Sequence, residues 1–276
     1  MNTVNAHGTA IPSIGFGTWT LKGDRAGQLV QDAIDAGYRH VDTVAMYDNE
    51  AAVGDGIRAA SVARDEIFIT TKIWHTDLAD GDLQRSAQDS LKRLGVDHVD
   101  LLLVHWPSKT IALSETIKAL NQVADMGYTK HIGVSNFTVP LLTEAAALSD
   151  RPLLCNQVEY HPMLNQDNVI SACRRLGSAV VSYCPLCRGG DLFTGEPVAS
   201  LAKKYAVSPA QIVLRWHVQQ PGVIAIPRST NRERIRQNLA VYDFTLSAVD
   251  MQAISALGNQ RKRLCDFEFS PQWDDA

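Results

Sequence analysis

The sequence has no long hydrophobic run and no excess of basic residues. Although 45% of its 276 residues are hydrophobic, the longest apolar run lies around residues 101–104 and is far too short to cross a bilayer. The net charge is −4, and Lys and Arg are not gathered in long runs, so the electrostatic footprint of a nucleic-acid binder is absent. The first ten residues lack a basic segment followed by an apolar one, so we expect no signal peptide. Membranes and nucleic acids are therefore not expected as partners.

Cysteine is scarce and odd in number. Five scattered thiols argue against a disulfide framework and favour a protein of the reducing cytoplasm. Cys184 and Cys187 form a C-x-x-C pair, which is either a redox motif or two thiols near the end of a strand. We favour the second interpretation, because this late pair lacks a βαβ unit of its own. A glycine fingerprint for dinucleotides is also incomplete, since residues 15–20 lack its third glycine and do not lead directly into a helix.

Eight short apolar runs alternate with helical patterns along the chain. Each run is rich in Val, Ile and Leu without strict alternation, as expected of parallel strands that are covered on both faces. The eight predicted strands span residues 12–17, 39–43, 66–73, 98–106, 130–134, 154–159, 179–183 and 223–226. Ahead of them, residues 3–11 are predicted to form a small hairpin around His7 and Gly8.

Helical periodicity fills the intervals between these strands. The predicted helices span residues 24–36, 49–60, 82–94, 114–126, 139–148, 166–176 and 208–219, with further helices at 196–205, 231–239 and 247–257. Several end just before a glycine, the common left-handed helix stop. The pattern predicts an α/β fold: a single (β/α)8 TIM barrel over residues 1–276, with an N-terminal hairpin and two extra helices. The alternative, an open doubly wound sheet, is disfavoured by the count of eight and by the incomplete glycine fingerprint.

Polar side chains stand at the carboxyl ends of several predicted strands, where such barrels build their active sites. The second strand ends at Asp42, with Tyr47 in the loop beyond it, the third at Lys72 and the fourth at His105. Singly, each has a structural explanation: an ion pair of Asp42 with Lys72, a rim histidine, or an ordinary loop aromatic. Four such groups on one rim favour a functional site, because partly buried charges are costly unless they are paired or used.

The four groups suit the reduction of a carbonyl. A Tyr phenol has a solution pKa near ~10 and needs a cation or a polarised partner to act near neutrality. We expect the Lys72 ammonium to lower the pKa of Tyr47, with Asp42 holding Lys72 charged and oriented. Neutral His105 would donate a hydrogen bond to the carbonyl oxygen, so that a proton donor faces a developing oxyanion. Aromatic walls that exclude water are expected from Trp19, Trp74 and Trp106.

A basic segment follows the last predicted strand. Residues 226–238 open a helix and place Arg228, Ser229 and Arg234 near its N-terminus. Backbone N–H groups and the helix dipole favour anions at such a position, and barrels often bind phosphate after their seventh and eighth strands. The segment is therefore either a phosphate grip, specifically for a 2′-phosphate, or a solvated basic helix face.

Seven short motifs occur along the chain. They are Gly15-Phe-Gly-Thr-Trp19, Asp42-Thr-x-x-x-Tyr47, Thr71-Lys72, His105-Trp-Pro107, Gly133-Val-Ser-Asn-Phe137, Asn156-Gln-Val-Glu-Tyr-His-Pro162 and Ile226-Pro-Arg-Ser229. In this order, and over essentially the whole chain, the set resembles the aldo-keto reductase superfamily. The similarity is greatest to bacterial 2,5-diketo-D-gluconate reductases, judged by residues 47–54 and by the Ser-Pro-Gln-Trp-Asp ending.

The resemblance implies roles for the matched residues. Tyr47 would be the general acid, assisted by Lys72 and Asp42, while His105 orients the carbonyl. NADPH would pass its hydride directly to the substrate, without a metal. The residues implied to bind NADPH or NADP+ are Thr18, Trp19, Asp42, Ser135, Asn136, Gln157, Tyr183, Cys184, Leu186, Arg228, Ser229, Thr230, Arg234, Gln237 and Asn238. The implied substrate pocket is lined by Trp19, Tyr47, Trp74, His105 and Trp106.

Departures from the family pattern bear on cofactor and substrate. Arg228 stands where many members have Lys, and this difference keeps the positive charge. Gln237 stands where many members have Glu, and Cys184 stands where Ser is frequent. The loop after the His105 motif and the tail are short, which predicts an open site for keto acids, keto sugars such as 2,5-diketo-D-gluconate, and aldehydes such as methylglyoxal. We therefore expect a monomeric NADP-dependent reductase. The alternatives are a cofactor-binding barrel with a non-catalytic or regulatory role, and an isomerase or lyase built on the Lys–Asp pair.

Overall fold

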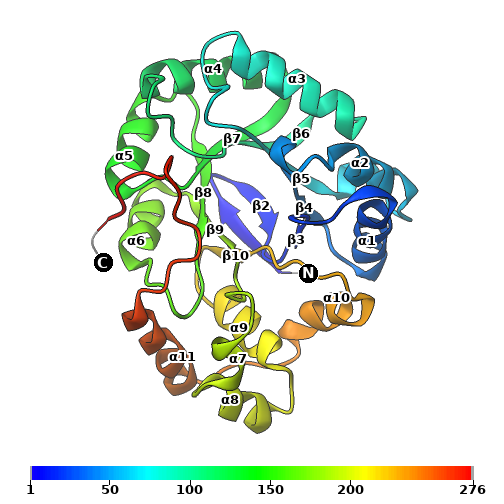
Figure 1. The fold of residues 1–276 in the computed structure, drawn as a ribbon, viewed down its shortest axis with the longest axis vertical. Coiled ribbons are helices and arrows are strands. Elements are labelled where there is room, and N and C mark those ends of the chain that lie inside the picture. Colours follow the sequence, from blue (N-terminus) through cyan, green and yellow to red (C-terminus); the bar gives the residue numbers. More distant parts are fainter. Residues whose placement is uncertain (1, 275–276) are drawn as a thin grey trace.

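Eight parallel strands form the inside of the structure, a computed structural model that describes residues 2–274 (Figure 1). The strands are β3 (Phe16–Gly17), β4 (His40–Asp42), β5 (Phe68–Ile73), β6 (Val99–Val104), β7 (Thr129–Ser135), β8 (Leu153–Glu159), β9 (Ala179–Tyr183) and β10 (Val223–Ala225). Each pairs with its neighbour in the sequence. The ring closes where the Gly15 N–H, just before β3, donates to the Ala225 carbonyl at 2.8 Å. The predicted eight-stranded barrel is confirmed.

An antiparallel hairpin covers one end of the barrel (Figure 1). Its strands, β1 (Thr3–Ala6) and β2 (Thr9–Pro12), are joined by a turn with Gly8 at φ 83°, as the sequence predicts. Its buried residues Ala6 and Ile11 share an apolar cluster with the barrel strands. Because Pro12 belongs to this hairpin, the first barrel strand is shorter than the predicted range of 12–17.

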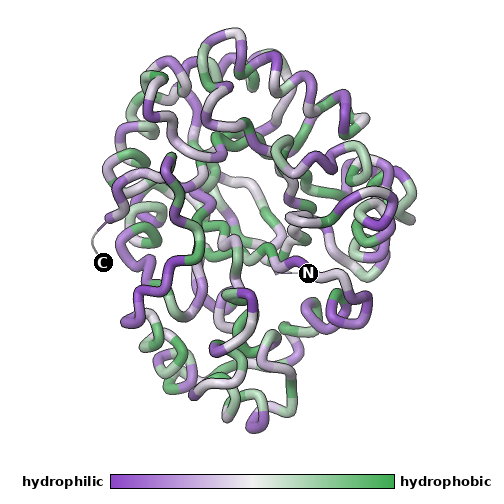
Figure 2. Tube along the Cα trace, in the orientation of Figure 1, coloured by the Kyte–Doolittle hydropathy of each residue, from purple (hydrophilic) through white to green (hydrophobic). Residues whose placement is uncertain are grey.

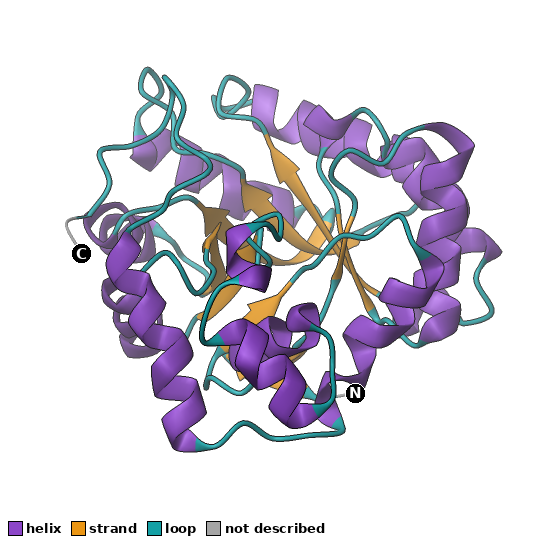
Figure 3. Ribbon diagram, turned by 60° about the horizontal axis from the view of Figure 1, so that its bottom comes forward, coloured by secondary structure: helices purple, strands orange, loops and turns teal. Residues whose placement is uncertain are grey.

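Helices form a ring outside the strands (Figures 1 and 3). They are α1 (Gly23–Ala36), α2 (Glu50–Ala59), α3 (Asp82–Leu94), α4 (Leu113–Asp125), α5 (Val139–Leu148), α6 (Asp167–Leu176), α7 (Asp191–Thr194), α8 (Val198–Tyr205), α9 (Pro209–Val218), α10 (Arg232–Leu239) and α11 (Ala248–Ser255). The predicted bounds of α3 and α5 match the structure, and the other predicted helices begin or end within two residues of it. Only α7 was not predicted, because it is a four-residue helix inside the loop after β9.

The strands are buried on both faces, which explains why their sequences are almost continuously apolar. In β6, Leu101 and Leu103 belong to the cluster inside the barrel, whereas Leu102 and Val104 belong to the larger cluster shared with the helices. Hydrophilic and hydrophobic residues alternate along the helices (Figure 2). Each helix therefore contributes one apolar face to the outer core and leaves the other to solvent.

The helix after the Asp42–Tyr47 segment, α2, is fixed by close backbone approaches. A Cβ on Gly56 would lie 2.3 Å from the Gly27 carbonyl oxygen of α1, so only glycine permits this packing. Just before α2, the Asn49 side chain donates to the carbonyls of Thr18 and Leu21 at 2.9 and 3.0 Å. The start of α2 is thereby tied to the loop after β3, and the segment between β4 and α2 is held at the rim.

The C-terminal tail, residues 261–274, turns back over the carboxyl ends of the strands (red in Figure 1). The backbone N–H groups of Leu264 and Cys265 both donate to the Glu159 carboxylate at the end of β8, at 2.7 Å. Farther along, Asp274 accepts a hydrogen bond from the Val139 N–H at the start of α5, at 2.8 Å. The tail is therefore part of the barrel rim.

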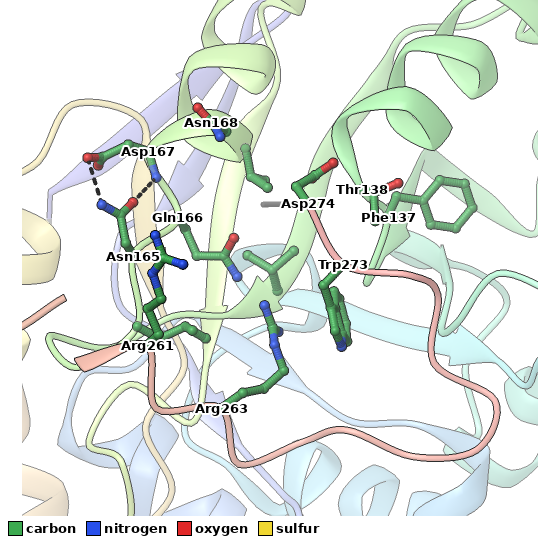
Figure 4. Close-up of a pocket in the computed structure, with 13 residues that line it drawn as sticks. Phe137, Thr138, Asn165, Gln166, Asp167, Asn168, Arg261, Arg263, Trp273 and Asp274 are labelled. Atoms are coloured by element: carbon green, nitrogen blue, oxygen red, sulfur yellow. Dashed lines mark hydrogen bonds between the residues drawn. The ribbon is translucent and has the colours of Figure 1, made fainter. Parts of the chain in front are cut away.

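A small cavity of about 170 Å³ lies between this tail and the start of α6 (Figure 4). The Arg263 guanidinium lies 3.7 Å from the centre of the Trp273 ring. Asn165 and Asp167 exchange two hydrogen bonds, of 3.2 and 2.7 Å, at its edge. None of the predicted site residues lines this cavity.

Candidate active site

Asp42 and Lys72 form a buried ion pair at adjacent strand ends. The Lys72 Nζ donates to Asp42 Oδ1 at 2.6 Å and to the Thr43 carbonyl at 2.9 Å. The side chains of Lys72 and Asp42 are only 1% and 3% exposed. The other carboxylate oxygen, Asp42 Oδ2, accepts a hydrogen bond from Gln157 Nε2 of β8 at 2.7 Å. Each charge therefore has the partners that a buried ion pair requires.

Tyr47 ends a 3-10 turn, Ala45–Tyr47, that follows β4. The Lys72 Nζ lies 6.0 Å from the centre of its ring. Burial raises the pKa of the phenol well above its usual value of 10.0, and the Asp42 carboxylate raises it further. The prediction that Lys72 lowers this pKa is therefore wrong. Burial disfavours the charged phenolate, and the Lys72 charge is already paired with Asp42.

His105 directly follows β6 and faces Tyr47. Their ring centroids are 6.5 Å apart, and the Trp74 ring lies 5.1 Å from His105 on another side. Burial lowers the pKa of His105 well below its usual 6.5, and the charges of Lys72 and His75 lower it further. His105 is therefore neutral near pH 7, as the sequence analysis expected, and a neutral imidazole has one N–H to donate.

The two rings border a cavity of about 820 Å³ at the carboxyl ends of the strands, within the size range of ligand sites, about 300–1,000 Å³. The predicted residues that line it are Thr18, Trp19, Asp42, Tyr47, Trp74, His105, Trp106, Asn136, Gln157, Tyr183, Cys184, Leu186, Arg228 and Arg234. The predicted residues outside this lining are Lys72, Ser135, Ser229, Thr230, Gln237 and Asn238. Most of the predicted site residues therefore share one cavity.

Two side-chain amides on the cavity wall are held in place by their neighbours. Asn136, with a left-handed backbone (φ 63°), donates through Nδ2 to the His105 carbonyl at 2.9 Å. Its Oδ1 accepts a hydrogen bond from the Tyr183 hydroxyl at 2.7 Å. Ser135 lies behind the wall, where its Oγ donates to the Gln157 carbonyl at 2.7 Å. Asn136 and Gln157 are therefore oriented by the fold itself.

Guanidinium groups line the cavity near the loop after β10. Arg228 donates through Nε to the Trp19 carbonyl at 3.2 Å. Arg234 lies in the first turn of α10, and its backbone N–H donates to the capping Asn231 side chain at 3.0 Å. Arg188, which was not predicted, lies 5.4 Å from the Trp19 ring. This part of the cavity suits a strongly anionic group.

Other predicted residues of the basic segment serve the local fold. Ser229 lies in the turn before α10, where its Oγ donates to a backbone carbonyl at 3.3 Å. The Thr230 carbonyl accepts from an arginine of α1 at 3.3 Å, and Gln237 bonds within α10 at 3.4 Å. Asn238 is only 5% exposed and lies near the Tyr38 side chain in the core, where it lowers the pKa of that phenol against the effect of burial. Asn238 follows the buried Ile235 by three residues, and this helical spacing was the sequence signal for its buried position.

Two aromatic residues of the tail form a wall that sequence reasoning missed. Phe269 stacks on His75 with ring centroids 4.7 Å apart, and it lies 5.2 Å from the rings of Trp74 and Trp106. Phe267 lies 5.8 Å from the Trp106 ring. Both residues line the cavity. The available signal was the concentration of aromatic residues in an otherwise polar tail.

The arrangement can protonate and orient an oxygen atom. Tyr47 and His105 are both uncharged hydrogen-bond donors that face the same cavity, next to a buried ion pair.

Across residues 2–274, no three His, Cys, Asp or Glu side chains gather as a metal site. Over the same residues, no helix has the length and apolar character needed to cross a membrane.

Comparisons with known proteins place this geometry in a family. The model of the aldo/keto reductase family matches residues 13–259. Methylglyoxal reductase DkgB of Escherichia coli O157:H7 is 39% identical over 268 residues, which cover 96% of this chain and 100% of that protein. A solved structure described as a candidate 2,5-diketo-D-gluconic acid reductase B matches with a TM-score of 0.97 and 38% identity, over 100% of this chain and 98% of its own. An aldo-keto reductase of Bombyx mori, solved in complex with NADP, matches with a TM-score of 0.89 and 34% identity, over 98% of this chain and 97% of its own. Its barrel, its strand-end residues and these matches along almost its whole length agree, and the chain belongs to the aldo/keto reductase family of oxidoreductases.

Proposed function

We propose that the chain is an NADPH-dependent reductase of small carbonyl compounds, with Tyr47 as its general acid. The observation that carries the proposal is the convergence of the Tyr47 and His105 donors on one cavity, beside the buried Lys72–Asp42 pair. A carbonyl oxygen that gains negative charge needs such donors. Carbonyl reductases among the relatives support the same reaction class.

The donor set of the cavity fits a phosphorylated dinucleotide. Asn136 and Gln157 would hold a carboxamide, and the Tyr183 ring would lie against a flat heterocycle. Arg228 and Arg234 would hold the 2′-phosphate, since a guanidinium binds phosphate oxygens in a fixed geometry. The relative solved with NADP supports this choice of cofactor. When bound, NADPH supplies the hydride for the carbonyl carbon.

Tyr47 and His105 act on the carbonyl oxygen. The neutral His105 imidazole donates a hydrogen bond that orients the carbonyl. The Tyr47 hydroxyl, which its raised pKa keeps protonated, gives its proton to the oxygen as negative charge develops there. An alkoxide is a stronger base than a phenolate, so the raised pKa does not prevent this transfer. The Lys72 ammonium then faces the phenolate, and Asp42 holds Lys72 in position.

The walls of the cavity favour small substrates. Three tryptophans and the tail residues Phe267 and Phe269 line the cavity together with Tyr47. We infer that the substrates are keto acids, keto sugars such as 2,5-diketo-D-gluconate, and aldehydes such as methylglyoxal, in line with the names of the relatives. No feature of the site favours a non-catalytic role, since the acid, the phenol, the lysine and the histidine are all present.

A substrate panel tests this function. Keto acids, dicarbonyls and sugar aldehydes are assayed for kcat/KM with NADPH and with NADH, and NADPH binding is followed by quenching of tryptophan fluorescence. The proposal predicts turnover of several carbonyls, with a higher kcat/KM for NADPH than for NADH. Quenching by NADPH without turnover of any carbonyl would instead identify a cofactor-binding protein, and the absence of quenching would favour an isomerase or lyase.

A further inference from the structure

Two segments far apart in the sequence lie side by side at the mouth of the cavity. One is the loop after β9, residues 184–191, and the other is the start of the tail, residues 261–265. Lys262 of the tail lies 3.8 Å from the Asp191 carboxylate, and the Cys265 N–H donates to Glu159 at 2.7 Å. Each segment places one partly exposed thiol in the cavity lining, Cys184 and Cys265.

The two thiols lie side by side, close enough for each to shift the pKa of the other. The Cys265 side chain lowers the pKa of Cys184, and the Arg188 charge lowers it further against the effect of burial. The Cys184 side chain and burial raise the pKa of Cys265. Cys184 therefore has the more nucleophilic sulfur at neutral pH, and Cys265 stands beside it as a thiol.

The remaining cysteines have no comparable partner at the surface. Cys155 and Cys173 are buried in the core, at 0% and 1% exposure. Cys187, the second cysteine of the C-x-x-C pair, is also buried, at 6%, and packs in the apolar cluster between strands and helices. Its backbone N–H donates to the Cys184 carbonyl at 2.9 Å, which forms a tight turn. The sulfur placed next to Cys184 in the cavity is that of Cys265.

We propose that Cys184 and Cys265 form a reversible disulfide when the protein meets hydrogen peroxide, and that this bond fastens the tail to the loop after β9. In the first step the Cys184 thiolate attacks one peroxide oxygen, the O–O bond breaks, and hydroxide leaves and is protonated to water, giving a sulfenic acid. In the second step the Cys265 sulfur attacks the Cys184 sulfur, the S–O bond breaks, and a second water leaves with the thiol proton. Two thiols are oxidised and one peroxide is reduced to two waters.

The Cys184–Cys265 disulfide would lie between two walls of the cavity. Phe267 and Phe269 follow Cys265 by two and four residues and form a wall of the cavity, while Leu186 and Arg188 follow Cys184 and form another. A disulfide would join the two walls covalently at the mouth. Exchange of ligands through this mouth should therefore slow in the oxidised protein and recover on reduction.

Peptide mapping of the intact chain tests the bond without any assay of activity. The reduced protein is treated with hydrogen peroxide, its free thiols are blocked and counted, and a non-reducing digest is analysed by mass spectrometry. We expect the count to fall from five thiols to three, with a Cys184–Cys265 peptide that dithiothreitol cleaves. Cys265→Ser should abolish the linked peptide, and the matched control Cys187→Ser should retain it. Five remaining thiols, a Cys184–Cys187 link, or a link that survives in Cys265→Ser would overturn the proposal.

The gating effect has its own measurement. The rate of NADPH release, followed by recovery of tryptophan fluorescence, is compared before and after peroxide within each protein. The rate of NADPH release from the wild type and from Cys187→Ser should fall several-fold after peroxide and recover with dithiothreitol. The rate for Cys265→Ser should not change. An unchanged release rate in wild type that carries the mapped disulfide would refute the gating effect. The disulfide is identified from linked peptides and not from activity. A protein that forms no disulfide can therefore be told apart from one that lacks the proposed reductase function.

Discussion

Gln157 Nε2 donates to one oxygen of the Asp42 carboxylate at 2.7 Å while Lys72 Nζ donates to the other at 2.6 Å. One buried carboxylate thus connects the amide wall of the cavity with the cation beside Tyr47. Gln157 is neutral, so the negative charge of Asp42 is balanced by Lys72. Removal of either charge would therefore leave the other buried without a counter-charge.

Replacing Lys72 with Met should destabilise the protein by about 3–5 kcal/mol, because the Asp42 carboxylate would stay buried without its counter-charge. The free energy of unfolding from urea titration measures this loss. The control is Lys92→Met, which breaks an exposed pair with Asp89 and should leave the free energy of unfolding nearly unchanged. A Lys72→Met variant as stable as the wild type would show that Asp42 is not charged in the folded protein.

Arg228→Ala and Arg234→Ala should each weaken the binding of NADPH more than that of NADH. The physical reason is that only NADPH carries the 2′-phosphate that we propose these guanidinium groups hold. A lost charge-assisted hydrogen bond corresponds to about 1.5–3 kcal/mol, or roughly a 10- to 100-fold higher Kd for NADPH. Tryptophan quenching measures both dissociation constants. The control is Arg236→Ala, an exposed arginine of the same helix that does not line the cavity. Equal losses for the two cofactors would refute the assignment.

The strand-end rule was sufficient to bring together Asp42, Lys72 and His105, because side chains at neighbouring parallel strand ends share one rim. The bounds of α3 were also predictable, since its apolar spacing and the glycine after it are local signals. The direction of the Tyr47 pKa shift was not predictable, because it depends on how deeply the fold buries the phenol and on the nearby Asp42 carboxylate.

The place of the tail could not be predicted from the sequence either. Its anchor joins Leu264 to Glu159, residues 105 positions apart, and no local pattern encodes such a contact. The walls supplied by Phe267 and Phe269 follow from that anchor. The sequence therefore predicts the polar groups at the rim but not the aromatic wall that the tail adds beside them.

Acidification should destabilise the fold through His40, whose ring is fully buried 3.1 Å from the Thr70 hydroxyl. Burial lowers its pKa from the usual 6.5 to about 4. Between these two values the unfolded chain binds a proton that the folded protein does not, so stability is present above pH 6.5 and falls as the pH drops towards 4.

Urea unfolding over this pH window measures the effect. His40→Gln should give a shallower fall in the free energy of unfolding than the wild type over the same range. The control His7→Gln alters an exposed histidine of the hairpin and should leave the slope as in the wild type. A wild-type slope in His40→Gln would mean that other groups dominate acid unfolding.

Phe269→Ala should open the substrate side of the cavity. The ring contacts His75, Trp74 and Trp106, and each aromatic contact contributes about 0.5–1.5 kcal/mol beyond its area. We expect kcat/KM for an aromatic aldehyde to fall several-fold and that for methylglyoxal to change less, because a small substrate reaches less of this wall. Val249→Ala, at an exposed position on α11, is the control. Equal changes for both substrates would argue that the tail acts only on stability.

The central claim is that Tyr47 gives the proton to the carbonyl oxygen, and Tyr47→Phe tests it most directly because it removes one hydroxyl and keeps the ring. Turnover of methylglyoxal with NADPH is measured next to NADPH binding by fluorescence, with Tyr128→Phe, a tyrosine outside the cavity lining, as the control. The account predicts that kcat falls by about 10²- to 10⁴-fold in Tyr47→Phe while NADPH still binds, and that Tyr128→Phe keeps its turnover. Full turnover in Tyr47→Phe would contradict the account.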